Sequence, residues 1–376
     1  MRNKSGVRRH HNPDQDISIP NSSLLTPLPL SGLPLAELEE TLSFLPRYRA
    51  VQIFKWIASG VSSFSQMNNL PLSLRNELEE RFAVRPPVKK NILEGADGTV
   101  KLVLEFSGVL TEAVLLTDIS GRSTACLSTQ CGCPANCVFC KTGAMGFTRN
   151  LDSSEIVEQF LQLKKTAEEK RDNELPSPLP VSNIVVMGMG EPLLNLAELR
   201  RALAVITDTK GLNFSKRRIT ISTCGIAEGI DDLGDNGPDV RLAVSITTAD
   251  EALRKQLMPI AASRPLIKVK AALRRFQDKG GGRVTLEAVL LGGINTRNED
   301  AAALAAFAKG LDVAVNLIPW NPVKGLEFEG KALREPSTAE VASFAGRLEA
   351  LHLNVTRRFR RGRAVEGACG QLGMSN

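Results

Sequence analysis

From residue 155 onward, short apolar runs alternate with amphipathic stretches. The apolar runs lie at 183–187, 219–223, 241–246, 284–291 and 313–318, and amphipathic stretches lie at 155–165, 196–206, 267–277 and 298–308. The runs have the length of buried strands, whereas the stretches repeat apolar residues at helical spacing. This alternation predicts an α/β fold with a parallel sheet that is closed or curled into a barrel. In such folds the active residues lie at the carboxyl ends of the strands.

The first third of the chain has a different pattern. Residues 31–82 predict three short helices, and Pro34 and Pro71 can each begin one. Residues 88–117 have strand character, with a hairpin turn at Asp97-Gly98. The last of these strands places the carboxylate of Glu112 among apolar neighbours.

These changes of pattern divide the chain into five parts. We expect a disordered basic tail at 1–28, a helical accessory domain at 29–87 and a β-hairpin and strand extension at 88–125. A core barrel at 126–350 and a C-terminal segment at 351–376 complete the division.

Charge and composition narrow the function. The net charge of +6, from 47 basic and 41 acidic residues, permits a nucleic-acid partner without requiring one. Basic residues gather in two runs, and each is either a phosphate-binding site or a solvated face. The runs are Lys216, Arg217 and Arg218, and then Arg357, Arg358, Arg360, Arg361 and Arg363. The chain has 3 histidines, so few residues are available for histidine acid–base catalysis or for a mixed Cys/His zinc site.

Five of the 7 cysteines lie between Cys126 and Cys140. The cysteine count is odd, and the N-terminus lacks the apolar segment of a secretory signal, so we expect a reducing cytoplasmic environment. No apolar run approaches the roughly 20 residues needed to span a bilayer, so we expect no membrane association. Clustered thiols in that environment indicate metal or redox chemistry. Cys131 and Cys224 are interpreted as ordinary buried thiols.

Cys133, Cys137 and Cys140 have the spacing C-x3-C-x2-C. A structural zinc site needs four ligands, usually from two pairs, and no second pair is present. Three thiolates instead suit a [4Fe–4S] cluster with one open iron, and Phe139 can give it apolar cover. This spacing is the radical S-adenosylmethionine (SAM) signature, and zinc is the weaker alternative.

A glycine-rich turn follows the apolar run at 183–187. In GMGEP, Gly188 and Gly190 allow the backbone to approach a ligand closely. Glu191 can accept a hydrogen bond from an ammonium group. Placed after the cysteine motif, this turn is similar to the SAM-binding motif of radical-SAM proteins.

Six motifs in order extend the similarity over residues 30–373. They are CLSTQCGCPANCVFC, GFTRNL, GMGEPLLN, SKRRITIST, NLIPWNP and ACGQL. Together they closely resemble the RlmN/Cfr family, radical-SAM enzymes that methylate adenine carbons in RNA. The resemblance implies a radical-SAM partial (β/α)6 barrel, a small N-terminal helical accessory domain and a C-terminal tail that carries a catalytic cysteine.

The resemblance also implies a role for each site residue. Cys133, Cys137 and Cys140 match the ligands of the [4Fe–4S] cluster. Cys369 matches the cysteine that carries the methyl group, Cys126 the cysteine that resolves the adduct through a transient disulfide with Cys369, and Glu112 the proton acceptor. The SAM contacts match Gly190, Glu191, Ser222, Ser245, Ile246, Thr247 and Asn321. The family uses two SAM molecules per turnover, one to methylate the cysteine and one to activate that methyl group.

The implied substrates are an adenosine in the peptidyl-transferase region of 23S rRNA and the adenosine next to the anticodon in tRNA, methylated at C2. The GFTRNL motif favours C2, whereas Cys131 in QCGC favours the alternative, Cfr-type C8 methylation with antibiotic resistance. Because stacking hides the target carbon, the adenosine must be exposed or flipped out. A monomer that receives electrons from flavodoxin or ferredoxin is the family expectation.

Several positions depart from the family pattern. Arg363, Ala364 and Glu366 stand where the family is richer in aspartate, and Thr247 stands where many members have histidine. These changes affect substrate and SAM contacts, but every thiol role remains filled. Two other functions stay open from the residues alone: a non-catalytic protein that binds zinc and RNA, and a radical-SAM reaction without a methylcysteine.

Overall fold

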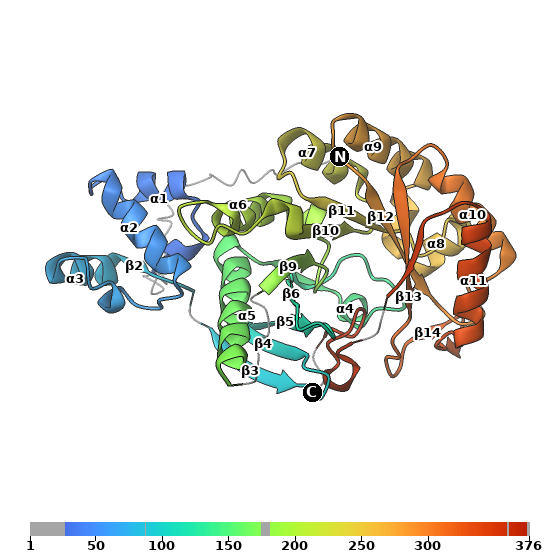
Figure 1. Ribbon diagram of the computed structural model, residues 1–376, viewed down its shortest axis with the longest axis horizontal. Helices are drawn as coiled ribbons and strands as arrows, with labels where there is room; N and C mark the ends of the chain where they lie inside the picture. Colours follow the sequence, from blue (N-terminus) through green and yellow to red (C-terminus); the bar gives the residue numbers. More distant parts are fainter. Residues whose placement is uncertain (1–26, 87, 174–180, 359–360, 374–376) are drawn as a thin grey trace, which may run out of the picture.

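The computed structural model describes residues 27–86, 88–173, 181–358 and 361–373. The predicted tail lies almost wholly outside these residues. A ten-stranded sheet forms the centre of the molecule, in the order β16-β13-β12-β11-β10-β9-β6-β5-β4-β3 (Figure 1). Its strands are β3 (Lys89–Glu94), β4 (Val100–Phe106), β5 (Val109–Thr117), β6 (Ser123–Cys126), β9 (Val181–Val186), β10 (Ile219–Thr223), β11 (Arg241–Ser245), β12 (Val284–Leu290), β13 (Val313–Pro319) and β16 (Val355–Arg357).

The sheet has two halves of different topology. Strands β3 to β6 pair antiparallel as successive hairpins, and β6, β9 to β13 and β16 pair parallel. The parallel strands follow chain order, as right-handed βα crossovers produce. Strands β3 and β16 form the two edges, so the curled sheet stays open. The predicted α/β class is confirmed, and β16 adds a parallel strand that no apolar run had indicated.

Helices cover the outer side of the parallel strands (Figure 1). They are α5 (Ser153–Asn173), α6 (Leu196–Thr207), α7 (Ala227–Asn236), α8 (Glu251–Leu257), α9 (Leu266–Asp278), α10 (Asn298–Ala308) and α11 (Thr338–Ala350). Alternation along a strand separates the two faces of the sheet. In β10, Ile219 and Ile221 are buried, whereas Ser222 is half-buried and lines a cavity on the other face. The inner face therefore carries the polar side chains.

The predicted helical segment contains α1 (Leu35–Thr41), α2 (Arg47–Ala58) and α3 (Leu72–Arg81). It packs closely on the core. Arg85 forms a largely buried ion pair with Glu158 of α5, at 2.5 Å, and Arg201 of α6 pairs with Glu37 at 2.6 Å. Gly32 lies so close to α5 that a Cβ there would be 2.4 Å from the Ser154 nitrogen.

Three small two-stranded sheets complete the fold. They are β1 (Leu28–Pro29) with β2 (Phe82–Ala83), β7 (Gln130–Gly132) with β8 (Phe147–Asn150), and β14 (Glu327–Phe328) with β15 (Lys331–Ala332). Among the described residues, no helix has the length and apolar character needed to span a membrane.

Candidate functional site

The three motif cysteines lie on the loop between β7 and α4 (Lys141–Ala144). Glycines give this loop its shape. Gly132 has φ +75°, and a Cβ there would be 1.9 Å from the Gly146 oxygen. A Cβ at Gly143 would be 2.8 Å from both the nitrogen and the oxygen of Cys137. Because a side chain at either position would collide with backbone, the loop closes tightly around the thiols.

Cys133, Cys137 and Cys140 line one cavity of about 170 Å³. Burial is the main cause that raises the pKa of each of these thiols, to about 12 for Cys133. Repulsion between the charges of neighbouring thiolates raises these pKa values further. The pocket therefore disfavours three free thiolates unless a cationic group binds them. Among the described residues, no group of three or more Cys, His, Asp or Glu side chains is arranged to hold a single metal ion.

The surroundings fit an iron–sulfur cluster. Phe139 and Trp320 line the same cavity, and the Trp320 indole donates a 2.8 Å hydrogen bond to the Phe139 carbonyl, which fixes the apolar cover. The buried guanidinium of Arg254 interacts with the charge of Cys137, and its Nε has no hydrogen-bond partner. Three thiols that line one cavity, and a buried cation whose charge interacts with one of them, suit a cationic iron–sulfur core whose complex with three thiolates is an anion.

The Gly190–Glu191 turn also lines this cavity. Gly190 has φ +101°, and a Cβ there would be 2.6 Å from the Cβ of Gln130. The Glu191 carboxylate accepts hydrogen bonds from the Leu193 nitrogen, at 3.0 Å, and from the Cys224 nitrogen, at 2.7 Å. Its side chain thus joins the ends of β9 and β10, and burial raises its pKa. An ammonium group would have to share these carboxylate oxygens with the two backbone donors.

The other predicted SAM contacts fall into three environments. Ser222 and Ser245 line the smaller cavity, with their hydroxyl oxygens 3.4 Å apart. Ile246 and Thr247 are buried at the end of β11; Thr247 has φ +55°, and its hydroxyl has no partner among the described residues. Asn321 lines a second cavity, donates to the Cys369 carbonyl at 3.1 Å and has a buried, unpartnered Oδ1.

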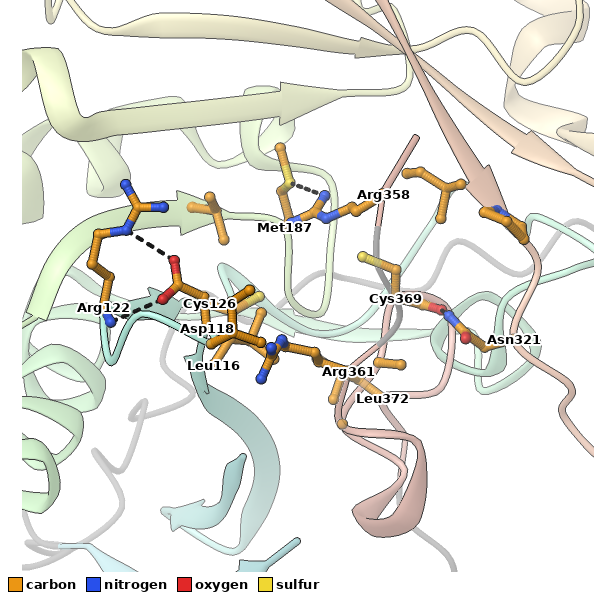
Figure 2. A pocket seen from close by; sticks show the side chains of 16 residues that line it. Leu116, Asp118, Arg122, Cys126, Met187, Asn321, Arg358, Arg361, Cys369 and Leu372 are labelled. Carbon is orange, nitrogen blue, oxygen red and sulfur yellow. Dashed lines mark hydrogen bonds and ion pairs between the residues drawn. The ribbon is translucent and has the colours of Figure 1, made fainter. Parts of the chain in front are cut away.

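That second cavity is larger, at about 610 Å³ (Figure 2). Cys126 lines it from the end of β6 and Cys369 from the C-terminal segment. Cys369 also lines the smaller cavity, together with Arg358. The structure therefore brings Cys126 and Cys369, which lie 243 positions apart in the sequence, to one cavity and places Cys369 between that cavity and the motif thiols.

Arg358 governs the electrostatics around these two thiols. Burial raises the pKa of Cys126 to about 12, and the negative charge of Cys369 adds to this, whereas Arg358 opposes it. The pKa of Arg358 is itself raised, first by Cys369 and then by Glu287 and Cys126. The sequence had indicated Arg358 only as one member of a basic run, because its partners come from the C-terminal segment, β12 and β6.

Glu112 does not line either cavity. It is 1 % exposed and forms a buried ion pair with Lys101 of β4, at 3.2 Å. Its other oxygen accepts a 2.8 Å hydrogen bond from the Gly373 nitrogen. Glu112 thus holds the segment that carries Cys369 against β5.

The two basic runs lie in different places. Lys216–Arg218 form an exposed turn before β10, at the amino ends of the strands and away from Ser222. Arg358 and Arg361 line the larger cavity, whereas Arg360 lies outside the described residues. Cys131 and Cys224 are both buried as predicted, and Cys224 also lines the cavity of the motif thiols.

Known proteins resemble the chain over most of its length. Residues 127–305 match the model of the radical SAM superfamily, and residues 30–84 match that of the ribosomal RNA large subunit methyltransferase N-terminal domain. A probable dual-specificity RNA methyltransferase RlmN from Treponema denticola is 48% identical over 345 residues, 92% of this chain and 95% of that protein. The dual-specificity RNA methyltransferase RlmN of Pelobacter propionicus is 39% identical over 347 residues, 91% of this chain and 95% of that protein.

A solved structure agrees with these matches. The crystal structure of a radical SAM methyltransferase from Sphaerobacter thermophilus superimposes with a TM-score of 0.85 at 37% identity, covering 92% of this chain and 99% of the other. The similarity in structure therefore extends over most of the chain.

Proposed function

The chain belongs to the RlmN family of radical SAM RNA methyltransferases, and from this membership we propose that it methylates adenosine at C2. The proposed substrates are an adenosine in the peptidyl-transferase region of 23S rRNA and the adenosine next to the anticodon in tRNA. The methyl group passes through Cys369. The relatives described above carry the RlmN name, and nothing in them favours the C8 alternative.

One observation carries the proposal: Cys369 lines both cavities. The motif thiols and the predicted SAM contacts Gly190, Ser222 and Ser245 lie on one side of it, and Cys126 lies on the other. A residue that takes a methyl group from SAM and delivers it to RNA needs access to both compartments.

Cys133, Cys137 and Cys140 would hold a [4Fe–4S] cluster, which when bound would supply the one-electron reduction of SAM and, through it, the radical chemistry that joins the methyl carbon on Cys369 to the adenine ring. The remaining work belongs to side chains. The Cys369 thiolate attacks the methyl carbon of a SAM sulfonium. A C–S bond to Cys369 forms, the bond from that carbon to the sulfonium sulfur breaks, and the thioether S-adenosylhomocysteine leaves. Arg358 favours the anionic form of Cys126, because its positive charge lowers the pKa of that thiol.

Release of the product is assigned to Cys126. Its thiolate attacks the sulfur of Cys369; an S–S bond forms, the bond from that sulfur to the product carbon breaks, and the carbon takes up a proton. An external reductant then restores both thiols. The two cysteines are free in this structure.

Glu112 is proposed as the acceptor of the adenine ring proton. Its carboxylate is engaged by Lys101 and by the Gly373 nitrogen, so it becomes available as a base only when the contact with Gly373 opens. We propose that RNA entering the larger cavity displaces this end of the segment. Flavodoxin or ferredoxin as electron donor and a monomeric state complete the proposal.

Nucleoside analysis tests the proposed function directly. The full chain, reconstituted anaerobically with iron and sulfide, is incubated with SAM, a reductant and either a 23S rRNA fragment or tRNA. The RNA is then digested and its nucleosides are separated by chromatography and mass spectrometry against both standards. We expect 2-methyladenosine from both RNAs, and 8-methyladenosine or unmodified RNA would overturn the proposal.

A further inference from the structure

The turn between β5 and β6 presents an apolar side chain to solvent at the edge of the larger cavity. Ile119 is 97 % exposed, and it lines that cavity together with Cys126 and Cys369. Single exposed apolar residues are common on protein surfaces, so exposure alone assigns nothing. Two further observations support a role for Ile119: its position at the cavity, and the hydrogen bonds that brace its turn.

Asp118 makes the turn rigid. Its Oδ1 accepts hydrogen bonds from the Ser120 nitrogen at 2.8 Å, the Ser120 hydroxyl at 2.6 Å and the Arg122 nitrogen at 3.0 Å. Arg122 Nε donates to the other oxygen at 2.9 Å (Figure 2). The Ser120 hydroxyl is the main cause that holds the pKa of Asp118 well below its usual range, so the carboxylate stays ionised at neutral pH. Ile119 is therefore held in place on a braced turn.

The surroundings of this turn suit RNA. Arg122, Arg358 and Arg361 line the same cavity, and Arg361 donates a hydrogen bond to the Thr117 carbonyl at the end of β5. Guanidinium groups at the cavity match the phosphates of an RNA backbone. The hairpin that carries Ile119 also ends in Cys126, the residue assigned to product release.

We propose that Ile119 is an apolar wedge that enters the RNA base stack beside the target adenosine. It fills the space that the adenine leaves when it turns into the larger cavity, as apolar wedges do in other nucleic-acid complexes. The inference rests on the proposed function only in requiring an adenosine outside the stack, and it does not depend on which carbon is methylated.

Two RNA hairpins test the wedge through kcat/KM. In one, the target adenosine is stacked; in the other, it is a bulged nucleotide that is already unstacked. We expect Ile119→Ser to lower kcat/KM about tenfold on the stacked hairpin and less than about twofold on the bulged one, because only the former needs the wedge. Ile119→Leu should retain activity on both. Ile267→Ser, at a 73 % exposed isoleucine of α9, is the matched control and should change neither. An equal loss on both hairpins, or no loss on either, would overturn the proposal.

A binding measurement separates the wedge from the chemistry. The cluster-loaded chain without reductant is titrated into a hairpin with 2-aminopurine in place of the target adenosine, and fluorescence rises as that base leaves the stack. We expect a several-fold rise with the unmodified chain and less than about a third of it with Ile119→Ser at saturation. If fluorescence rises equally with the unmodified chain and with Ile119→Ser, the wedge is overturned, whether or not the RNA is methylated. If the two chains differ in fluorescence as expected but the RNA is not methylated, only the proposed function is overturned.

A separate observation concerns Arg254 of α8. Its side chain is 1 % exposed, and the structure gives it no ion pair with any described carboxylate. One Nη donates to the Cys224 carbonyl at 2.6 Å, while Nε has no partner. Glu251 affects its charge more weakly than burial does, and burial lowers the Arg254 pKa. A buried guanidinium that forms no close ion pair is strongly destabilising.

The neighbouring thiols can supply negative charge close to the Arg254 guanidinium. Cys137 and Cys224 both interact with the Arg254 charge, and Val138 of the cysteine loop donates a 3.0 Å hydrogen bond to Leu257 of the same helix. Three thiolates outweigh the positive charge of an oxidised [4Fe–4S] cubane, so the bound cluster is an anion that becomes more negative on reduction.

We infer that Arg254 is the counter-cation of the cluster: it favours cluster binding and makes the cluster easier to reduce. Arg254→Met should lower the iron and sulfide bound per chain and shift the EPR-monitored midpoint to more negative potential. At the midpoint of the unmodified chain, we expect the ratio of oxidised to reduced cluster to rise about tenfold, which corresponds to 59 mV for one electron. Arg254→Lys should preserve much of the effect, and Lys255→Met, an exposed neighbour on α8, should change nothing.

The cluster-free protein distinguishes this role from simple packing. Without the cluster the guanidinium keeps the attraction of Glu251, which is weaker than the cost of burial, so we expect cluster-free Arg254→Met to be at least as stable as the unmodified cluster-free chain in urea. Lower stability would assign Arg254 to packing, and unchanged cluster loading and potential would also overturn the inference. Neither readout involves RNA; if the unmodified chain bound no cluster, the proposed function would fail as well.

Discussion

The two cysteine-bearing regions of the site are held in place by different kinds of contact. The loop of Cys133, Cys137 and Cys140 is fixed by backbone: the Cys133 nitrogen donates to the Gly146 oxygen at 2.8 Å, and the Gly132 and Gly143 positions leave no room for a side chain. Such contacts change little with side-chain chemistry.

The segment that carries Cys369 depends mostly on side chains of other elements. The Gly362 nitrogen donates to Asp97 at 2.7 Å, Gly373 donates to Glu112 at 2.8 Å, and Asn321 donates to Cys369 at 3.1 Å. Residues 361–373 of this segment contain one short 3-10 helix, Arg363–Val365, and no strand. The comparison indicates that backbone contacts shape the proposed cofactor region, whereas side-chain contacts hold the proposed methyl-carrying region.

Removing one cysteine from each region should separate their roles most clearly. We expect Cys137→Ala to lose most of the bound iron and, with it, methylation. Cys369→Ala should bind iron normally and yet lower turnover by about a thousandfold or more, because the nucleophile is gone. Iron content and product formation are measured on the same samples, with Cys131→Ala as control. Iron loss in Cys369→Ala would contradict the separation of the two regions.

Removing Cys126 should stop the reaction after methyl transfer. Cys126→Ala is expected to accumulate protein joined to RNA, since no thiolate attacks the Cys369 sulfur. A denaturing gel shows the adduct as a slow band that ribonuclease shifts back. Free methylated RNA at the normal rate would remove Cys126 from product release.

Changing Glu112 should weaken the support of the C-terminal segment. Glu112→Gln leaves Lys101 buried without its anion, so we expect the free energy of unfolding to fall by about 3–5 kcal/mol. Urea unfolding of the cluster-free protein measures this change. The double variant Lys101→Met/Glu112→Leu should recover most of the stability but no activity, and a loss below about 1 kcal/mol in Glu112→Gln would contradict the importance of the pair.

The smallest effect concerns pH. The pKa of the Cys126 thiol rises from 9.0 to about 12 in the folded chain. Between these values the unfolded chain has released a proton that the folded chain retains, so stability is full below pH 9 and falls as pH rises. We expect Cys126→Ser to reduce this fall by about 1 kcal/mol at pH 10. Identical pH profiles for the two cluster-free proteins would show that Cys126 is not protected by burial.

The sequence predicted those parts of the molecule that depend on local spacing. The interval from Cys133 to Cys140 defines a loop, and periodic apolar residues define strands and helices, because neighbouring residues determine both. Partnerships across the sheet were not predictable in this way. Arg254 and Cys137, or Lys101 and Glu112, meet only after strands and helices have packed, and one arginine in a charged helix resembles any other. The full exposure of Ile119 is likewise a property of its folded turn.

The distance along the chain between Cys369 and its supports has a biosynthetic consequence. Glu112 and Asp97 lie 261 and 265 positions before the glycines that they bind. Closing loops of this length is slow, and the segment leaves the ribosome after the rest of the sheet. The cysteine loop is thus complete while one wall of its cavity is still missing. The docking of residues 361–373 then closes this cavity, since Cys369, Gly370 and Leu372 form part of its lining.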